Sequence, residues 1–220
     1  MRDAYHEELE AVSDRLVRMT ESAGAAITMA SEALLAADLT LAEHVISADR
    51  TIDDLRDELD DKVVELLARQ QPVATELRII VAALRMAEDV ERMGDLALHI
   101  AKLTRLRYPA ATIPDPLRVD FATMGTIAQR LTEKLRTVIA EHDPDGAQEL
   151  DHDDDEMDQL HRKHFATMAS VSWSHGIEAA IDVTLASRYY ERYADHSVKA
   201  ARRVYYLVNG TRPAHSSSLR

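Results

Sequence analysis

The residues of this chain best suited to chemistry are four pairs of carboxylates. In each pair, the second residue stands four positions after the first. Two pairs belong to nearly identical phrases, Glu91-Arg-Met-Gly-Asp95 and Glu191-Arg-Tyr-Ala-Asp195. Residues at this spacing lie on the same side of an α-helix, about 40° apart around its axis. Two carboxylates placed in this way repel each other unless a positive group lies between them. Each phrase therefore predicts a metal ion or an arginine beside it.

The glutamate of each phrase stands where a helix bundle needs an apolar residue. Positions seven apart share one side of a helix. The two rows that contain the glutamates are Leu77, Leu84, Glu91, Leu98 and Ile177, Thr184, Glu191, Val198. A carboxylate in such a row loses part of its hydration, so it needs a compensating partner.

The other two pairs lie on an earlier helical segment of each half of the chain. If the earlier segment packs beside the later one, four carboxylates come together in each half of the chain. Oxygen ligands suit hard cations such as Mg²⁺, Mn²⁺ and Ca²⁺, and carboxylate clusters also hold iron. The sequence thus predicts two metal sites, whose ligands are Asp49, Asp53, Glu91 and Asp95 in the first and Asp154, Asp158, Glu191 and Asp195 in the second.

Histidines and arginines leave two interpretations of these clusters open. His161 and His196 can add nitrogen ligands to the second cluster, whereas Arg56 and Leu96 stand at the corresponding positions of the first. Alternatively, the acids are neutralised by ion pairs instead of metal. The arginines placed for this role are Arg85, Arg92, Arg188 and Arg192.

An apolar period of 3.6 residues predicts six helices and an all-α fold. The first runs from Tyr5 to Ala37. The second opens with a capping box at Thr40 and ends before Pro72, and the third ends near Tyr108. Asp-Pro pairs at 115–116 and 143–144 predict the starts of the fourth and fifth helices. The sixth runs from about Ser174 to a C-cap at Asn209-Gly210.

The acidic phrases recur with their surroundings, which indicates an internal duplication. Asp49-x-x-Ile52-Asp53 returns as Asp154-x-x-Met157-Asp158, and the later phrase returns one hundred residues on (191 − 91). The sequence predicts two tandem three-helix bundles, over residues 1–108 and 117–210, with a linker at 109–116 and a flexible tail at 211–220.

The composition excludes several classes of partner and site. The formal net charge of −13 argues against binding to nucleic acid, which repels an acidic body. The absence of cysteine excludes disulfides and thiolate metal sites. Residues 1–8 have no apolar stretch typical of a secretion signal, so a cytoplasmic location is expected.

The motifs resemble those of the PhoU family, the phosphate-signalling regulators of bacteria and archaea. The family has two Glu/Asp-x-x-x-Asp motifs in each repeat, and all four pairs of this chain match them. The segment from Ile46 to Leu55, the phrase Glu191-Arg-Tyr-Ala-Asp-His196 and the ending Tyr206-Leu-Val-Asn-Gly210 are also similar. The resemblance extends from about Tyr5 to Gly210.

This resemblance implies a cytoplasmic homodimer with iron, zinc, manganese or magnesium at the motif surface. It further implies an adaptor between the phosphate-specific ABC transporter, with its ATPase, and a sensor histidine kinase. Such a protein modulates phosphate uptake and represses the phosphate-starvation response when phosphate is plentiful. It reaches the membrane only through the transporter.

The sequence contains no pairing of a nucleophile with a base and no glycine-rich phosphate loop. We therefore expect a regulator that is not an enzyme. The alternative from another class is a metal-dependent enzyme, of di-iron or phosphohydrolase type, that uses the carboxylate clusters and needs an open coordination position.

Overall fold

The computed structural model describes residues 2–70, 72–73 and 75–211, so all but the first residue of the predicted tail lies outside the described residues. The described chain is helical and contains no strand. Its elements are α1 (Arg2–Ala36), α2 (Leu39–Ala48), α3 (Arg50–Gln70), α4 (Thr75–Arg107), the 3₁₀ turn η1 (Asp115–Leu117), α5 (Arg118–Glu141), α6 (Pro144–Asp153), α7 (Asp155–Met168) and α8 (Gly176–Asn209). The predicted all-α class is confirmed.

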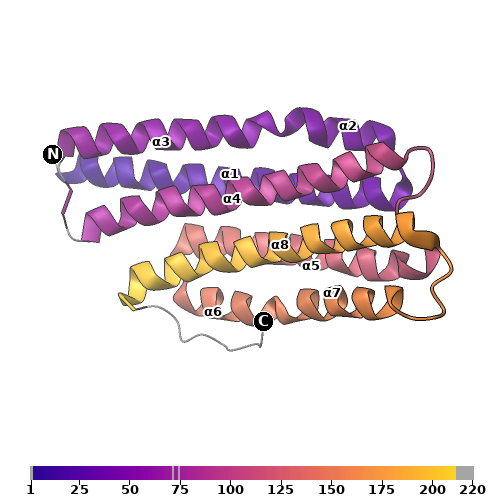
Figure 1. Ribbon diagram of the computed structural model, residues 1–220. Coiled ribbons are helices and arrows are strands. Elements are labelled where there is room, and N and C mark those ends of the chain that lie inside the picture. The colour runs from indigo at the N-terminus through magenta and orange to yellow at the C-terminus, as the bar shows by residue number, and fades with distance from the viewer. Residues whose placement is uncertain (1, 71, 74, 212–220) are drawn as a thin grey trace.

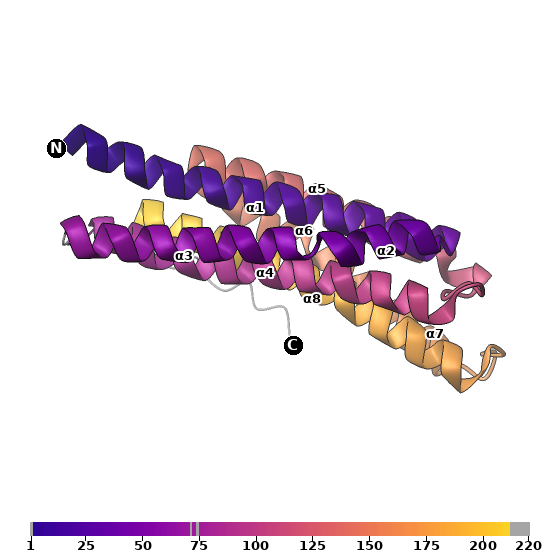
Figure 2. The same ribbon diagram turned by 90° about the horizontal axis from the view of Figure 1, so that it is seen from above.

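Two three-helix groups lie side by side along their length (Figure 1). In the first, α1 and α4 pack together and against α2 and α3; in the second, α5 and α8 pack together and against α6 and α7. The groups meet where α1 packs on α5 and α4 packs on α8. Figure 2 shows α1 and α5 on one side of the molecule and α4 and α8 on the other. A single hydrophobic core runs through both groups.

The second and fifth predicted helices are each interrupted, which the sequence pattern did not predict. The interruptions fall at Asp49, between α2 and α3, and at Asp154, between α6 and α7. Aspartate favours helix ends because its short side chain competes with the backbone for hydrogen bonds. Each break creates a helix N-terminus beside an acidic cluster, and the partial positive charge there stabilises carboxylates in the first turn. Among the acids in these first turns are Asp53 in α3 and Asp158 in α7.

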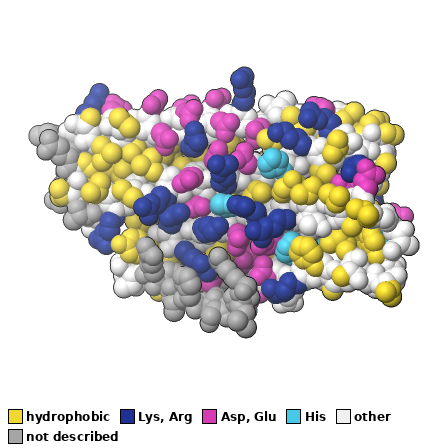
Figure 3. Space-filling model, viewed as in Figure 1, with side chains coloured by type: hydrophobic (Ala, Val, Ile, Leu, Met, Phe, Trp, Pro, Cys, Tyr) yellow, Lys and Arg dark blue, Asp and Glu magenta, His cyan; other side chains and the backbone are white. Residues whose placement is uncertain are grey.

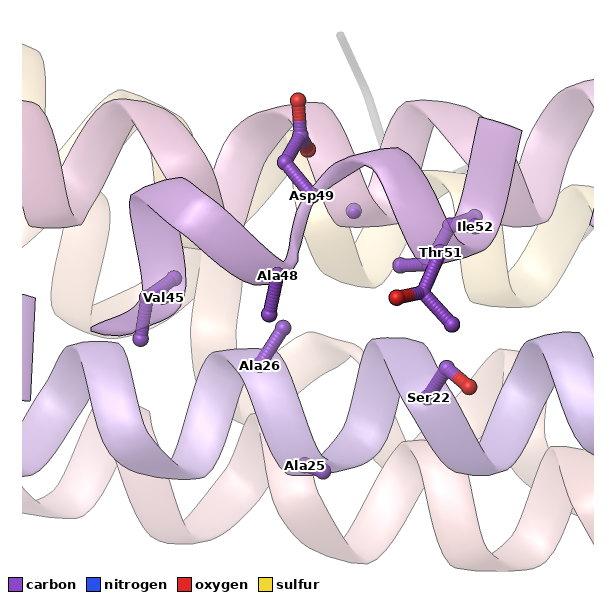
Figure 4. A pocket seen from close by; sticks show the side chains of 9 residues that line it. Ser22, Ala25, Ala26, Val45, Ala48, Asp49, Thr51 and Ile52 are labelled. Atoms are coloured by element: carbon purple, nitrogen blue, oxygen red, sulfur yellow. The ribbon is translucent and has the colours of Figure 1, made fainter. Parts of the chain in front are cut away.

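The break at Asp49 leaves a small cavity of about 150 Å³ against α1. Figure 4 shows the Asp49 carboxylate pointing away from α1, while Val45 and Ala48 face it. Gly94 of α4 forms another part of the lining, and a Cβ added there would come within 2.6 Å of Ile52 Cδ1. The absence of a side chain at position 94 thus allows α3 to approach α4, which brings the acids of the two helices together.

Several predicted helix ends are confirmed and two are wrong. Asp143 caps α6 by accepting a hydrogen bond from the Asp145 N–H at 3.0 Å, and Gly210 ends α8 with a φ of 70°. Thr40 is not the cap of α2: Asp38 has this role, since it accepts from the Leu41 N–H at 3.0 Å. Asp115 begins the 3₁₀ turn instead of capping an α-helix.

Candidate metal centre

The second acidic cluster brings together its four predicted carboxylates from α7, α8 and the break at Asp154. Burial and the nearby charges of Asp158, Asp195 and Glu191 raise the pKa of Asp154 to about 7. Burial, followed by the charge of Asp195, also raises the pKa of Glu191. One carboxylate oxygen of Asp154, Oδ1, is buried and has no hydrogen-bond partner. The cluster thus concentrates negative charge without enough positive charge to balance it.

The first cluster has the same arrangement with weaker effects. Burial, and then the charges of Asp53 and Asp95, raises the pKa of Asp49, while Lys102 acts in the opposite direction. Burial, followed by Asp95, raises the pKa of Glu91. Charge interactions therefore link the acids within each cluster, but the convergence of four carboxylates on one ion stays a prediction. In the described part of the chain, no three acidic or histidine side chains stand close enough to hold one metal ion.

Arginines neutralise some of the eight acids and leave others without an ion pair. Arg92 contacts Asp95 at 2.6 Å, and Arg188 contacts Glu191 at 2.5 Å. Arg162 reaches Asp158 at 3.4 Å. Glu91 has two guanidinium groups, those of Arg56 and Arg92, at 3.7 Å each. Of the eight acids of the two clusters, four make no ion pair within the described residues: Asp49, Asp53, Asp154 and Asp195.

His161 lies beside the second cluster, as the sequence predicted. Its Nδ1 is 2.8 Å from the hydroxyl of Ser187, and the charge of Asp158 acts on it. The hydroxyl occupies Nδ1 and orients the ring, so Nε2 is the nitrogen that a metal would use. In the first cluster, the place of this imidazole is taken by the Arg56 guanidinium, which lies 3.7 Å from Glu91. Arg56 thus gives the first cluster a cation at the position where the second has a histidine, while Arg162 and Arg188 contact other acids of the second cluster.

His196, the other candidate nitrogen ligand, is held elsewhere. It is buried on α8, and its Nδ1 lies 3.0 Å from Asp89 Oδ1 on α4. The Arg203 guanidinium donates to the other oxygen of Asp89 at 2.9 Å. These three residues connect the two helix groups instead of serving the acidic cluster. The sequence analysis missed Asp89, and its only signal was an unexplained acid two positions before the Glu91 motif.

A second ion pair between the groups was also missed. Arg107, at the end of α4, binds Asp182 of α8 at 2.6 Å, and Asp182 is buried. Neither residue belongs to a repeated motif. Both pairs join α4 to α8, which shows that charged contacts as well as apolar ones fix the two groups against each other.

The pKa of Asp154 predicts how the stability of the metal-free protein depends on pH. The folded protein keeps a proton on Asp154 up to about pH 7, whereas the unfolded chain releases it near the usual value of 3.8. Folding therefore binds a proton between these limits, and the free energy of unfolding falls as the pH rises through them. Allowing for partial exposure, we expect a loss on the order of 2 kcal/mol from pH 5 to pH 8.

Urea unfolding of chelator-treated protein at pH 5 and pH 8 measures this loss. Asp154→Asn should flatten the dependence, since asparagine does not titrate. Asp155→Asn is the matched control, because Asp155 is the next residue and is half-exposed. Equal pH dependence of the two variants would contradict the prediction.

The fold and the repeated clusters together define a class: a duplicated all-α protein with an acidic motif pair in each repeat. The family model for the PhoU domain matches the chain twice, at residues 16–104 and 121–204. The chain therefore belongs to the PhoU family, as the motifs predicted.

Named relatives cover almost the whole chain. The phosphate-specific transport system accessory protein PhoU homolog 2 of Mycobacterium tuberculosis is 46% identical over 97% of this chain and 100% of the relative. Homolog 1 of Mycobacterium leprae is 44% identical over 97% of this chain and 96% of its own length.

Solved structures agree with the fold. The crystal structure of PhoU from Pseudomonas aeruginosa matches with a TM-score of 0.83 and 28% identity, over 94% of this chain and 100% of that one. The phosphate transport system regulatory protein PhoU from Streptococcus pneumoniae gives a TM-score of 0.84 at 21% identity, over 96% and 100% of the two chains. This second likeness shows the fold alone.

Proposed function

We propose that the chain is an accessory regulator of a phosphate-specific transport system. The observation that carries this proposal is the 46% identity, over nearly the full length of both chains, to a mycobacterial protein named for that role. In this proposal the protein is a cytoplasmic homodimer that links the transporter and its ATPase to a sensor histidine kinase. It represses the phosphate-starvation response and limits uptake when phosphate is plentiful.

The alternative of a metal-dependent enzyme gains no support from the relatives. They are named as accessory proteins of a transport system, and the solved neighbours are PhoU proteins with no reaction in their names. A membrane-spanning role is not suggested either: within the described residues, no helix has both the length and the hydropathy to cross a bilayer.

The proposal includes a metal ion at the second cluster. The residues suit a hard or borderline cation, because the charges of Asp158, Asp195 and Glu191 act on Asp154 and its buried Oδ1 has no partner. Asp154, Asp158, Glu191 and Asp195 would hold the ion, with His161 as the nitrogen donor. A bound cation would neutralise the charge that raises the pKa of Asp154 and would brace α7 against α8. The first cluster would bind more weakly, since Arg56 and Arg92 already contact Glu91.

Deletion of the gene tests the regulatory role. In phosphate-rich medium, the deletion should raise expression from phosphate-starvation promoters and raise phosphate uptake several-fold. Both should return to normal when the wild-type gene is restored. The strain must lack any second family member, because Mycobacterium tuberculosis has proteins named homolog 1 and homolog 2. Unchanged expression and uptake in such a strain would contradict the proposal.

A further inference from the structure

The exposed large apolar side chains of the described residues lie almost entirely on four helices and the loops beside them. The described residues include 14 large hydrophobics that are exposed, and 13 of them lie on α3, α4, α7, α8 or the loops next to these helices. The exception is Val119 on α5. Apolar patches that are restricted to one face and bordered by charge mark interaction surfaces. We name the outer surface of α4 and α8, with the adjoining parts of α3 and α7, the α4–α8 face.

Two apolar patches on this face share two pairs of repeated positions. The first patch consists of Val64, Leu67, Leu77 and Val81, and the second of Phe165, Ile177, Ile181 and Leu185. Leu77 and Ile177, like Val81 and Ile181, are one hundred positions apart, as are the two acidic phrases. Because α4 and α8 run in opposite directions, the patches fall at opposite ends of the face (Figures 1 and 3). The second patch borders a shallow groove of about 720 Å³.

A basic strip separates the patches. It consists of Arg92, Arg188, Arg192 and Lys199, and Figure 3 shows Lys and Arg side chains gathered over α4 and α8 near the middle of the view. Arg92 and Arg188 pair with acids of the two clusters. Among the contacts of the described residues, Arg192 and Lys199 make neither an ion pair nor a side-chain hydrogen bond. Unpaired cations are therefore offered to a partner on a chain whose net charge is −13.

We propose that the α4–α8 face is the docking surface for a protein of the phosphate transport system that presents an acidic strip between two apolar contacts. The strip of Arg192 and Lys199 selects acidic residues by charge. The two patches supply apolar anchors, and their repetition suits a partner that offers the same apolar element twice. The identity of the partner rests on the proposed function, whereas the location of the surface rests on the patches and the strip.

The charges on and beside this face disfavour two other occupants, a second copy of the chain and an anionic membrane. A second copy in a two-fold arrangement would bring Arg192 and Lys199 close to the same residues of its partner, and like charges repel. An anionic membrane would meet acidic side chains at the first patch, because Asp60 and Glu88 line the same hollow as Val64 and Leu67. A protein can place acidic groups only opposite the strip, which a lipid surface cannot do.

Binding to the purified transport complex in nanodiscs tests this proposal. Val81→Glu and Ile181→Glu should each weaken binding by about tenfold, and the two together by more. Arg192→Glu with Lys199→Glu should weaken it to a similar degree and reduce its dependence on salt. Val119→Glu is the matched control, because it adds the same charge at an exposed hydrophobic on α5, and it should bind as the wild type does.

The possible outcomes distinguish failure of the proposed docking surface from failure of the proposed function. If the wild type binds and the patch variants bind equally well, the surface is wrong and the function stands. If Ile181→Glu abolishes flotation with phosphatidylglycerol vesicles, or converts a dimer to a monomer in gel filtration, the face serves a membrane or a second copy and the proposal is overturned.

If the wild type does not bind the complex, the proposed function fails and the face is judged in growing cells. A photo-crosslinking residue at 81 and at 181 should then give adducts with one protein, at acidic segments located by mass spectrometry. The absence of such adducts would overturn the docking surface as well.

Discussion

Replacing Asp154 with asparagine is expected to weaken Mn²⁺ binding by about 100-fold, while the equivalent change Asp49→Asn has a much smaller effect. Loss of a metal ligand lowers affinity at least as much as loss of a residue that hydrogen-bonds a ligand. The second kind of loss lowers metal affinity roughly 10- to 100-fold. Asp154 has a buried oxygen without a partner, and burial and four neighbouring acids raise its pKa to about 7. A bound cation would relieve this repulsion, so we expect Asp154 to gain more from a metal than any other acid of the two clusters.

The first cluster is expected to gain less because its glutamate, Glu91, has two guanidinium groups beside it, whereas Glu191 has the single guanidinium of Arg188. Arg56 and Arg92 contact Glu91, and Lys102 lowers the pKa of Asp49 against the effect of burial. In the second cluster His161 stands where Arg56 stands in the first, and an imidazole can coordinate a metal that a guanidinium only repels. The two sites, although products of one duplication, are thus expected to differ in affinity.

Isothermal titration with Mn²⁺, on protein first treated with chelator, measures this difference. The wild type and Asp49→Asn should both retain one tight site, and elemental analysis of protein purified without chelator should agree. Asp155→Asn is the control for loss of a nearby charge and should bind as the wild type does. Tight binding by Asp154→Asn, or a larger loss in Asp49→Asn than in Asp154→Asn, would contradict the assignment.

Features that repeat along the chain were predictable from the sequence. The apolar period, the Asp143-Pro144 start and the Asn209-Gly210 end gave the helices, and the matched acidic phrases gave the duplication. Local periodicity and repetition were sufficient for all of these features.

Features that depend on contacts between distant helices were not predictable. The interruptions at Asp49 and Asp154 contain no proline or glycine, so no local breaker indicated them. The pairing of Glu91 with Arg56 depends on how α3 lies against α4. His196 follows Asp195 in the chain, yet the packing of α8 on α4 directs it to Asp89. Adjacency in sequence suggested a ligand, and the tertiary fold gave the residue a different partner.

Asp89→Ala is expected to lower the free energy of unfolding by about 3 kcal/mol, because it breaks a buried charged network. Asp89 is 6% exposed; one of its oxygens lies 3.0 Å from His196 Nδ1, and the other accepts from Arg203 at 2.9 Å. Truncation leaves both partners without an acceptor at the contact of α4 with α8. Glu88→Ala is the control, since Glu88 is the exposed neighbour of Asp89 on the same helix.

The double variant Asp89→Ala with Arg203→Ala separates a lost attraction from an uncompensated charge. If most of the loss comes from the unpaired guanidinium, removal of Arg203 should restore roughly 1 kcal/mol or more, because no buried charge then remains without a partner. Urea unfolding of the single and double variants, with Glu88→Ala alongside, measures this recovery. A single variant as stable as the Glu88→Ala control would show that the network does not hold the groups together. Because Asp89 belongs to the first helix group and its two partners to the second, a measured coupling energy would report directly on how strongly the repeats are joined.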